Sequence, residues 1–204
     1  MKLIFPRMVC VIFTLFLSIP LAGAITLFTP ERLLESKPLT KKQGYLLIDL
    51  DVNGSAPSLV YQQLSARDQK YLAAGQQARL LGKEKTMDLK DKPAGFYLAK
   101  IPAGLYQITR VNAPYFNLPF RVDTSSRREW RFSIEPGQIN YIGKLVIDKK
   151  RSTQYVDIDL VNRIATNKAD IENQLSTLLE NFPLRLGVGV RDDFLTSLSD
   201  EQGQ

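Results

Sequence analysis

Short segments in which apolar and polar residues alternate make up most of this chain, and turns containing proline or glycine separate them. Alternation with a period of two is typical of a β-strand with one buried face. Many such strands followed by one late helix predict a mainly β protein, an antiparallel β-sandwich of Ig-like or prealbumin-like class with one C-terminal α-helix. We expect strands over residues 45–52, 59–64, 77–81, 96–101, 105–111, 129–134, 139–148, 154–160 and 186–190.

Two turns are specified by their residues. Pro102-Ala103-Gly104 predicts a tight hairpin between its flanking strands, because proline pre-sets the first turn position and glycine suits the exit. Glu135-Pro136-Gly137-Gln138 has the pattern of a type II turn, which needs a positive φ at its glycine. Before the second turn, Trp130, Phe132 and Ile134 alternate with other residues and are expected to share the inner face.

The one clear helix lies near the C-terminus. Thr166 or Asn167 is its expected cap, and Pro183 its expected stop. We expect its apolar stripe to dock on the edge or face of a sheet, with binding to a partner protein as the alternative. The stripe consists of Ile171, Leu175, Leu178 and Leu179. A shorter helix is expected over residues 30–36.

The first 24 residues have the pattern of a cleaved secretory signal peptide. Lys2 and Arg7 precede an apolar run, and Ala22-Gly23-Ala24 supplies the small residues of a cleavage site. We therefore expect cleavage after Ala24 and a periplasmic or secreted protein, with an uncleaved N-terminal anchor as the alternative. The predicted organisation is a signal peptide (1–24), an N-terminal lead-in (25–43), a β-sandwich domain (44–163), a C-terminal helix with a last strand (164–191) and a flexible tail (192–204).

The residue inventory limits the chemistry of the mature chain. Histidine is absent, and the only cysteine, Cys10, lies inside the expected signal peptide. Catalytic arrangements that need Ser-His-Asp or Cys-His cannot be built, nor can zinc sites of the usual Cys and His kind or an internal disulfide. We therefore predict a protein that is not an enzyme and has no cofactor. No motif indicates nucleic acid as a partner.

Two groups of side chains are candidate binding residues. Tyr115 and Phe116 lie in a proline-flanked loop, where exposed aromatic rings often serve recognition. Arg127, Arg128 and Arg131 form a basic cluster that would attract an anionic partner. The favoured interpretation is simpler, that the arginines are solvated turn residues and the aromatics pack in the core.

Two Asp-x-Asp pairs are weaker candidates for a metal or catalytic site: Asp49 with Asp51, and Asp157 with Asp159. Residues two apart in a strand face the same way, so each pair presents two carboxylates about 7 Å apart. Oxygen ligands of this kind suit Ca²⁺ or Mg²⁺, and paired carboxylates serve glycosidases. The favoured interpretation is simpler, that they are the solvent-facing residues of two half-buried strands.

The segment from Gly95 to Asp148 carries a further pattern, Phe96-x-Leu98-x-x-Ile101-Pro102-Ala103-Gly104-x-Tyr106-x-Ile108. It resembles the strand–Pro-Ala-Gly–strand core of carboxypeptidase-regulatory-like and Cna-B-type β-sandwiches, which have prealbumin-like folds. Together with Phe132-x-Ile134-x-Pro136-Gly137-x-x-x-Tyr141-Ile142-Gly143, it is also similar to uncharacterised bacterial envelope domains, which are often lipoproteins. The resemblance implies a β-sandwich that binds or spaces and has no shared active-site residues.

These observations support three function hypotheses. The first is a non-enzymatic, exported envelope module that binds another envelope protein through the 113–118 loop, the arginine cluster and the C-terminal helix. The second is binding of an anionic glycan, lipopolysaccharide or lipid surface through basic and aromatic loops, which would weaken steeply with salt. The third is a carboxylate- or metal-dependent hydrolase that uses the aspartate pairs.

Overall fold

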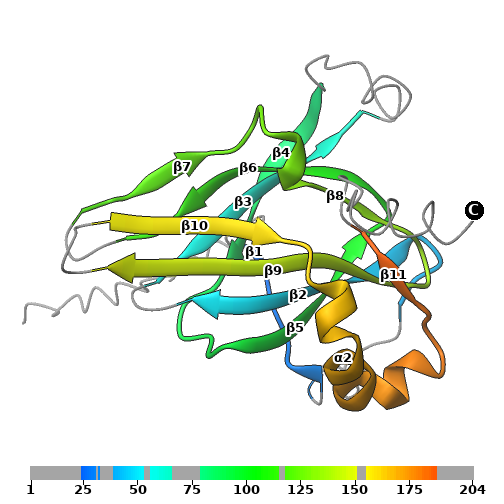
Figure 1. The fold of residues 1–204 in the computed structure, drawn as a ribbon. Coiled ribbons are helices and arrows are strands. Elements are labelled where there is room, and N and C mark those ends of the chain that lie inside the picture. Colours follow the sequence, from blue (N-terminus) through cyan, green and yellow to red (C-terminus); the bar gives the residue numbers. More distant parts are fainter. Residues whose placement is uncertain are drawn as a thin grey trace, which may run out of the picture.

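The computed structural model describes residues 24–30, 32, 39–52, 56–65, 79–114, 118–150 and 155–187, and these form two β-sheets packed face to face. One long helix lies against the outer face of one sheet (Figure 1). The predicted fold class, a mainly β and mostly antiparallel sandwich with a C-terminal helix, is therefore confirmed.

The two sheets are named A and B. Sheet A consists of β1 (Ala24–Ile25), β3 (Ser58–Leu64), β4 (Leu80–Asp88), β6 (Gly104–Asn112), β7 (Arg121–Asp123) and β8 (Arg131–Ile134). Its order is β1-β4-β3-β6-β7, and β8 also pairs with β6. Sheet B consists of β2 (Gln43–Val52), β5 (Gly95–Pro102), β9 (Ile139–Lys150), β10 (Tyr155–Val161) and β11 (Leu184–Leu186). Its order is β10-β9-β2-β5, and β11 also pairs with β9.

Three strand pairs run parallel, which the expected antiparallel pattern did not include. In the centre of sheet B, β2 and β9 are parallel, with Leu50 opposite Leu145. The pairs β1–β4 and β11–β9 are parallel as well. Parallel neighbours need a long connection, and sheet A provides it, because most of its strands lie between β2 and β9 in the sequence.

The turn at Pro102-Ala103-Gly104 does not form the predicted hairpin. It follows β5, which pairs with β2 in sheet B, and precedes β6, which pairs with β3 in sheet A. The turn thus carries the chain from one layer to the other. The Tyr106 hydroxyl donates to the Pro102 carbonyl over 2.8 Å, and the Ala103 N–H donates to the Lys42 carbonyl over 2.8 Å. These two hydrogen bonds stabilise the corner, where a hairpin would have hydrogen bonds between β5 and β6 instead.

The second turn also crosses between layers. It joins β8 in sheet A to β9 in sheet B. Gly137 has a φ of +67°, the positive value that the type II pattern predicted. Both proline–glycine turns therefore reverse the chain as expected, but each places the next strand in the opposite sheet.

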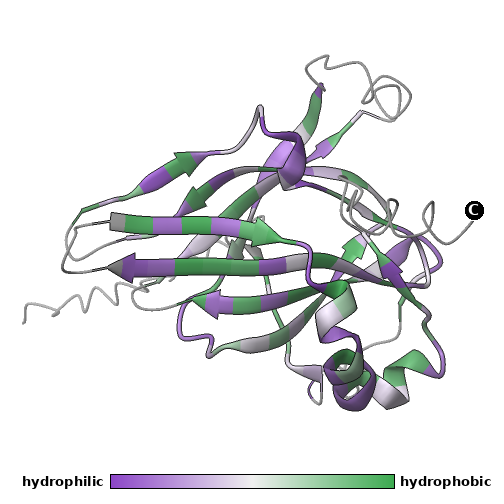
Figure 2. Ribbon diagram, in the orientation of Figure 1, coloured by the Kyte–Doolittle hydropathy of each residue, from purple (hydrophilic) through white to green (hydrophobic). Residues whose placement is uncertain are grey.

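The main core lies between the sheets. Trp130, Phe132 and Ile134 are all buried there, as predicted, although Trp130 belongs to a 3₁₀ turn, η3 (Arg128–Trp130), rather than to a strand. The rings of Tyr106 and Phe132 stack with centroids 5.3 Å apart, and Tyr61 packs against both. Figure 2 shows the alternation of apolar and polar residues along β10, whose apolar side faces this core.

Strand β2 is more deeply buried than its alternation predicted. Ile48 and Leu50 face the core between the sheets, as expected. On the other face, Tyr45 and Leu47 belong to a second apolar cluster under α2 (Ile164–Leu179). Asp49 is only 8% exposed, so the expectation of a solvent-facing carboxylate is wrong at this position. The reason is the helix, which covers this end of the sheet.

The helix packs on its own sheet through the predicted stripe. Ile171, Leu175 and Leu178 are buried against sheet B, so this stripe is not available to a partner protein. The predicted caps are wrong, because α2 begins at Ile164, before Thr166 and Asn167. The Asn162 side-chain oxygen instead accepts the Ile164 N–H over 3.1 Å.

Two other expected strands have different bounds. Strand β4 runs over Leu80–Asp88 and does not end at residue 81. The sequence pattern missed its exposed half, because that half contains the charged stretch Lys83-Glu84-Lys85. The last strand is Leu184–Leu186 rather than 186–190, and residues 188–190 lie outside the described part. Pro30 and Arg32 are helical, and the rest of the helix expected there also lies outside it. None of the helices in the described ranges combines the length and hydropathy that a membrane crossing requires.

Candidate interaction site

A surface hollow of about 220 Å³ lies at the end of sheet A where β6 leads into β7. We call it the β6–β7 hollow. Two arginines and an asparagine supply its polar groups, and two prolines and a phenylalanine supply apolar walls. The residues that line it are Arg110, Asn112, Pro114, Pro119, Phe120 and Arg121.

The strand register places the polar groups on one face. Asn112 lies opposite Arg121 across the β6–β7 ladder, and the residue pair between Asn112 and Arg110 is Val111 with Val122. Val111 is fully buried in the core between the sheets. Because side chains alternate along a strand, Arg110, Asn112 and Arg121 project from the outer face of sheet A.

Two of these polar groups already have partners within the chain. Arg110 forms an ion pair with Glu84 on β4, with 3.2 Å between Nη2 and Oε2. The Asn112 side-chain N–H donates to the Ser58 hydroxyl oxygen over 2.9 Å. Arg121 is exposed and enters none of the ion pairs found among the described residues. Its guanidinium is therefore the cation of the hollow that remains most available to a ligand.

One carboxylate lies close to the arginines. The Ser125 hydroxyl donates to Asp123 Oδ1 over 2.6 Å, and the Ser125 N–H donates to the same oxygen over 2.8 Å. These hydrogen bonds hold the pKa of Asp123 below its ordinary value, and the charges of Arg110 and Arg127 act in the same direction. The outer face of sheet A thus carries charges of both signs.

Large apolar side chains stand exposed beside the hollow. Leu118 is 69% exposed and Phe120 is 39% exposed, and among the described residues only Leu81 is a comparable exposed hydrophobe. The connection that carries them is tied down at both ends. The Ala113 N–H donates to the Phe120 carbonyl over 2.9 Å, and Lys149 Nζ donates to the Pro114 carbonyl over 2.8 Å. Burial lowers the pKa of Lys149.

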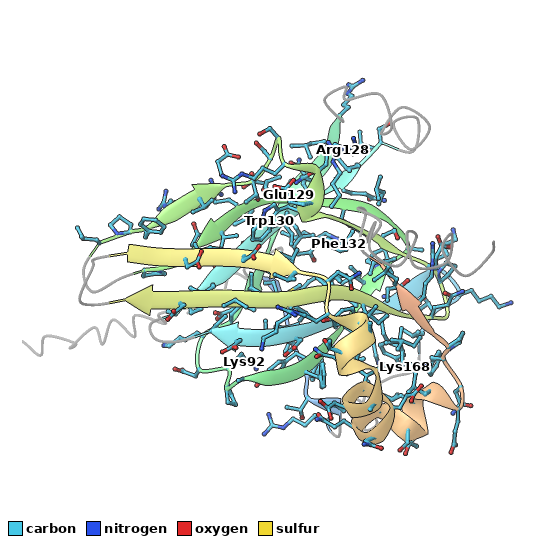
Figure 3. The ribbon with its side chains drawn as sticks, viewed as in Figure 1. Lys92, Arg128, Glu129, Trp130, Phe132 and Lys168 are labelled. Carbon is cyan, nitrogen blue, oxygen red and sulfur yellow. The ribbon has the colours of Figure 1, made fainter. Side chains whose placement is uncertain are left out.

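The predicted arginine cluster is divided by the structure. Arg127 and Arg128 are exposed. Arg128 begins η3, which ends at the buried Trp130, and both are labelled in Figure 3. Arg131 is only 6% exposed, and its Nε donates to the side-chain oxygen of Gln107 over 2.8 Å. The expectation that Arg131 extends the basic surface is therefore wrong. It fails because the chain before β8 folds over the outer side of β6 and covers this side chain.

The buried amide of Gln107 explains why Arg131 lies inside. Its Nε2 donates to the carbonyls of Ile108, Thr124 and Arg127, and its oxygen accepts from Arg131. One side chain thus satisfies two carbonyls of the segment that covers it, those of Thr124 and Arg127. Arg131 therefore stabilises this buried hydrogen-bond network and is not part of the basic surface.

The candidate aromatic residues Tyr115 and Phe116 lie outside the described residues. Pro114 and Pro119, which flank their loop, line the hollow, and the role of the two aromatic residues stays a prediction. Arg110, Asn112 and Phe120 were missed. The signal for Arg110 and Asn112 was present as the polar positions of an alternating strand, but only the β6–β7 register brings them beside Arg121.

The two aspartate pairs share a sheet without joining. Asp49 and Asp51 are on β2, Asp157 and Asp159 are on β10, and β9 lies between these strands. Asp51 pairs with Lys144 over 3.0 Å, and Asp157 and Asp159 are exposed as expected. Among the described residues, no group of three or more acidic, histidine or cysteine side chains is placed to hold a metal ion.

Asp49 is held under the first turn of α2. Asn167 Nδ2 donates to Asp49 Oδ2 over 2.8 Å, which ties the helix to the sheet. Burial raises the pKa of Asp49, and this effect outweighs the Lys144 charge and the Asn167 hydrogen bond, which lower it. Asp49, whose carboxylate was expected to face solvent, therefore connects the helix to the sheet.

This contact predicts a pH dependence. Because the folded chain binds the Asp49 proton more tightly than the unfolded chain, this group's contribution to stability is full below the unfolded pKa. This contribution is lost as the pH rises through the raised pKa that Asp49 has in the folded chain. We expect the free energy of unfolding of Asp49→Asn, relative to wild type, to increase from about pH 4 to about pH 7. Urea titrations across this range measure it, with the exposed Asp157→Asn as control. A constant difference for Asp49→Asn would contradict the assignment.

Comparison of the sequence with protein-family models and with curated proteins gave no match. The function of the chain is therefore inferred from the chemistry of the β6–β7 hollow itself. Its lining combines two guanidinium groups, one amide and apolar walls, and large exposed hydrophobes stand beside it.

Proposed function

We propose that this chain is an exported, non-enzymatic envelope module that binds another protein through the β6–β7 hollow and the exposed side chains beside it. The observation that carries the proposal is the exposure of Leu118 and Phe120 next to Arg121. Exposed leucine and phenylalanine lose contact with water when a partner covers them, which favours association. Aromatic and arginine side chains are also the residues that most often dominate the energy of a protein interface.

Export is supported by the signal pattern at the N-terminus. A cut after Ala24 would fall inside β1 and remove the pairing of Ala24 with Thr86. It would leave Ile25 to pair with Met87 of β4 and Leu27 buried in the core. The mass of the purified protein, expressed with its own signal, tests the position of the cut.

The fold class is compatible with the resemblance seen in the sequence. Carboxypeptidase-regulatory-like and Cna-B-type domains are β-sandwiches that bind or space other parts of a protein. The resemblance names no site, because fold alone does not carry function. The proposed site therefore rests on the hollow and not on the family.

The test is capture of an envelope partner by cross-linking, with matched variants of the mature protein. We expect one dominant protein partner, still captured at high salt. Leu118→Asp should reduce its capture about 10-fold or more, because a charge replaces the most exposed apolar side chain beside the hollow. Leu81→Asp is the control, since Leu81 is also an exposed leucine, on β4. Equal capture by wild type and Leu118→Asp would contradict the proposal.

The same experiment separates the proposal from glycan or lipid binding. Recovery of lipopolysaccharide or another anionic polymer alone, lost steeply as salt is raised, would favour the second hypothesis instead. Arg121→Glu and Arg128→Glu provide a second matched pair, because both arginines are exposed on sheet A or its loops. Of these two arginines, only Arg121 lines the hollow. We therefore expect Arg121→Glu to reduce capture of the partner and Arg128→Glu to leave it unchanged.

A further inference from the structure

We infer that the β6–β7 hollow receives an acidic side chain, aspartate or glutamate, from an extended segment of the partner protein. An apolar residue next to this acid in the partner would pack on Leu118 and Phe120. This inference rests on the proposed function, since it names the chemistry of the partner at the same site.

The size of the hollow favours one side chain. Sites for small molecules and cofactors typically enclose about 300–1,000 Å³. The hollow has about 220 Å³, which is below this range and sufficient for a single side chain. The partner's remaining contacts must therefore lie outside it, where Leu118 offers the most exposed apolar surface among the described residues.

The polar lining favours a carboxylate. Guanidinium groups bind carboxylates through charge-assisted hydrogen bonds, often two at a time. Arg110 already illustrates this chemistry, because the Glu84 carboxylate lies 3.2 Å from its Nη2. Arg121 offers a second guanidinium across the ladder from Asn112.

The charges around the hollow argue against a flat anionic surface. Glu84 and Asp123 lie near the arginines on the same side of sheet A. A bilayer or an acidic polymer that covered this face would meet both carboxylates as well as the arginines, and like charges oppose each other. The hollow itself is lined by the two arginines and the asparagine and by neither of these carboxylates, so a single acidic side chain that enters at Arg121 lies against the arginine that has no ion-pair partner among the described residues. The pattern therefore favours a discrete acidic residue of a protein.

The probe is a phage-displayed library of random peptides, selected on the immobilised mature protein. We expect the enriched peptides to share an aspartate or glutamate adjacent to a large apolar residue. A synthetic copy of one such peptide should bind about 10-fold or more weakly to Arg121→Gln and to Leu118→Asp. Its affinity for Leu81→Asp should equal that for wild type.

A double-mutant cycle identifies the pair. Changing the acid of the peptide to its amide should weaken binding to wild type about 10-fold, and should add little when the protein already carries Arg121→Gln. Additive losses would overturn the assignment of the acid to the hollow. Enriched peptides without an acid that still need Leu118 would overturn this inference and leave the proposed function intact.

Three further outcomes also decide the matter. Peptides that bind Leu118→Asp as well as wild type would overturn the inference, because their site would lie elsewhere. No enrichment over the Leu118→Asp protein would overturn it as well. Binding to vesicles containing phosphatidylglycerol, lost in Arg121→Gln, would assign the arginines to a lipid surface instead. The proposed function fails separately, if the envelope partner is captured equally by Leu118→Asp.

Discussion

Replacing Asn140 by alanine should lower the free energy of unfolding by about 3 kcal/mol or more. The Asn140 amide is fully buried on β9 and joins two parts of the fold. Its oxygen accepts the Glu135 N–H over 3.0 Å. Its Nδ2 donates to the carbonyls of Tyr45, Glu135 and Gln138 over 3.1, 3.2 and 3.0 Å. Removing the amide takes a hydrogen-bond partner from each of these backbone groups, although the Gln138 carbonyl still accepts the Tyr45 N–H over 2.9 Å. Each buried polar group that is left unpaired costs about 1–3 kcal/mol.

Asn140→Asp tests the direction of these hydrogen bonds. Aspartate has nearly the same shape, but its carboxylate would place an acceptor against the three carbonyl oxygens that Asn140 Nδ2 now contacts. We expect it to be at least as destabilising as alanine at neutral pH. Asn112→Ala is the control, because Asn112 is only half-buried and its amide donates once, to Ser58. Urea unfolding measures all three, and a loss for Asn140→Ala no larger than the control's would contradict the role of this amide.

The second large effect is expected at Gly44. A Cβ atom at this position would overlap the Glu135 carbonyl oxygen and lie 2.9 Å from Ile134 Cγ2. The overlap is with backbone, so a side-chain rotation cannot relieve it. Gly44→Ala should therefore lower the free energy of unfolding by about 3 kcal/mol.

Gly137→Ala is the matched control for Gly44. Gly137 has a φ of +67° and no atom within 4 Å of a Cβ built there. Its substitution costs only the left-handed backbone conformation, about 1–2 kcal/mol. Thermal or urea unfolding should therefore rank Gly44→Ala as the more destabilising variant. The reverse order would show that the close approach of β2 to the 135–138 turn relaxes easily.

Local patterns predicted the strands but not their neighbours. Alternation around Leu50 and Phe132 identified strands and inner faces, because side-chain direction is a local property. The turn at Pro102-Ala103-Gly104 specified a reversal of the chain, yet both a hairpin and a crossing between sheets begin with such a reversal. Only the pairing of β5 with β2 and of β6 with β3 decides between them.

The same limit explains the errors at charged residues. Asp49 is buried by a helix whose contacting residue, Asn167, is distant in the sequence, and no pattern near Asp49 indicates that cover. Arg131 is buried under the segment that precedes β8, where it donates to Gln107 on another strand. The sequence singled out the loop that Pro114 and Pro119 flank, and both prolines line the hollow, but the loop's candidate residues Tyr115 and Phe116 lie outside the described residues. The hollow's arginine from β6 could not be placed beside Arg121 without the register of the ladder.

The parallel pairing of β2 with β9 has a consequence for the order of folding. Residues 45–52 of β2 find their partners on one side only when residues 139–147 are present, as Tyr45 lies opposite Ile139. Closing so long a loop costs entropy before the contact repays it, which slows folding. A chain that ends before β9 lacks the centre of sheet B and the strand on which β10 and β11 pair. Sheet B cannot be completed before β9 is available, so we expect its assembly to be completed late, from the C-terminal side.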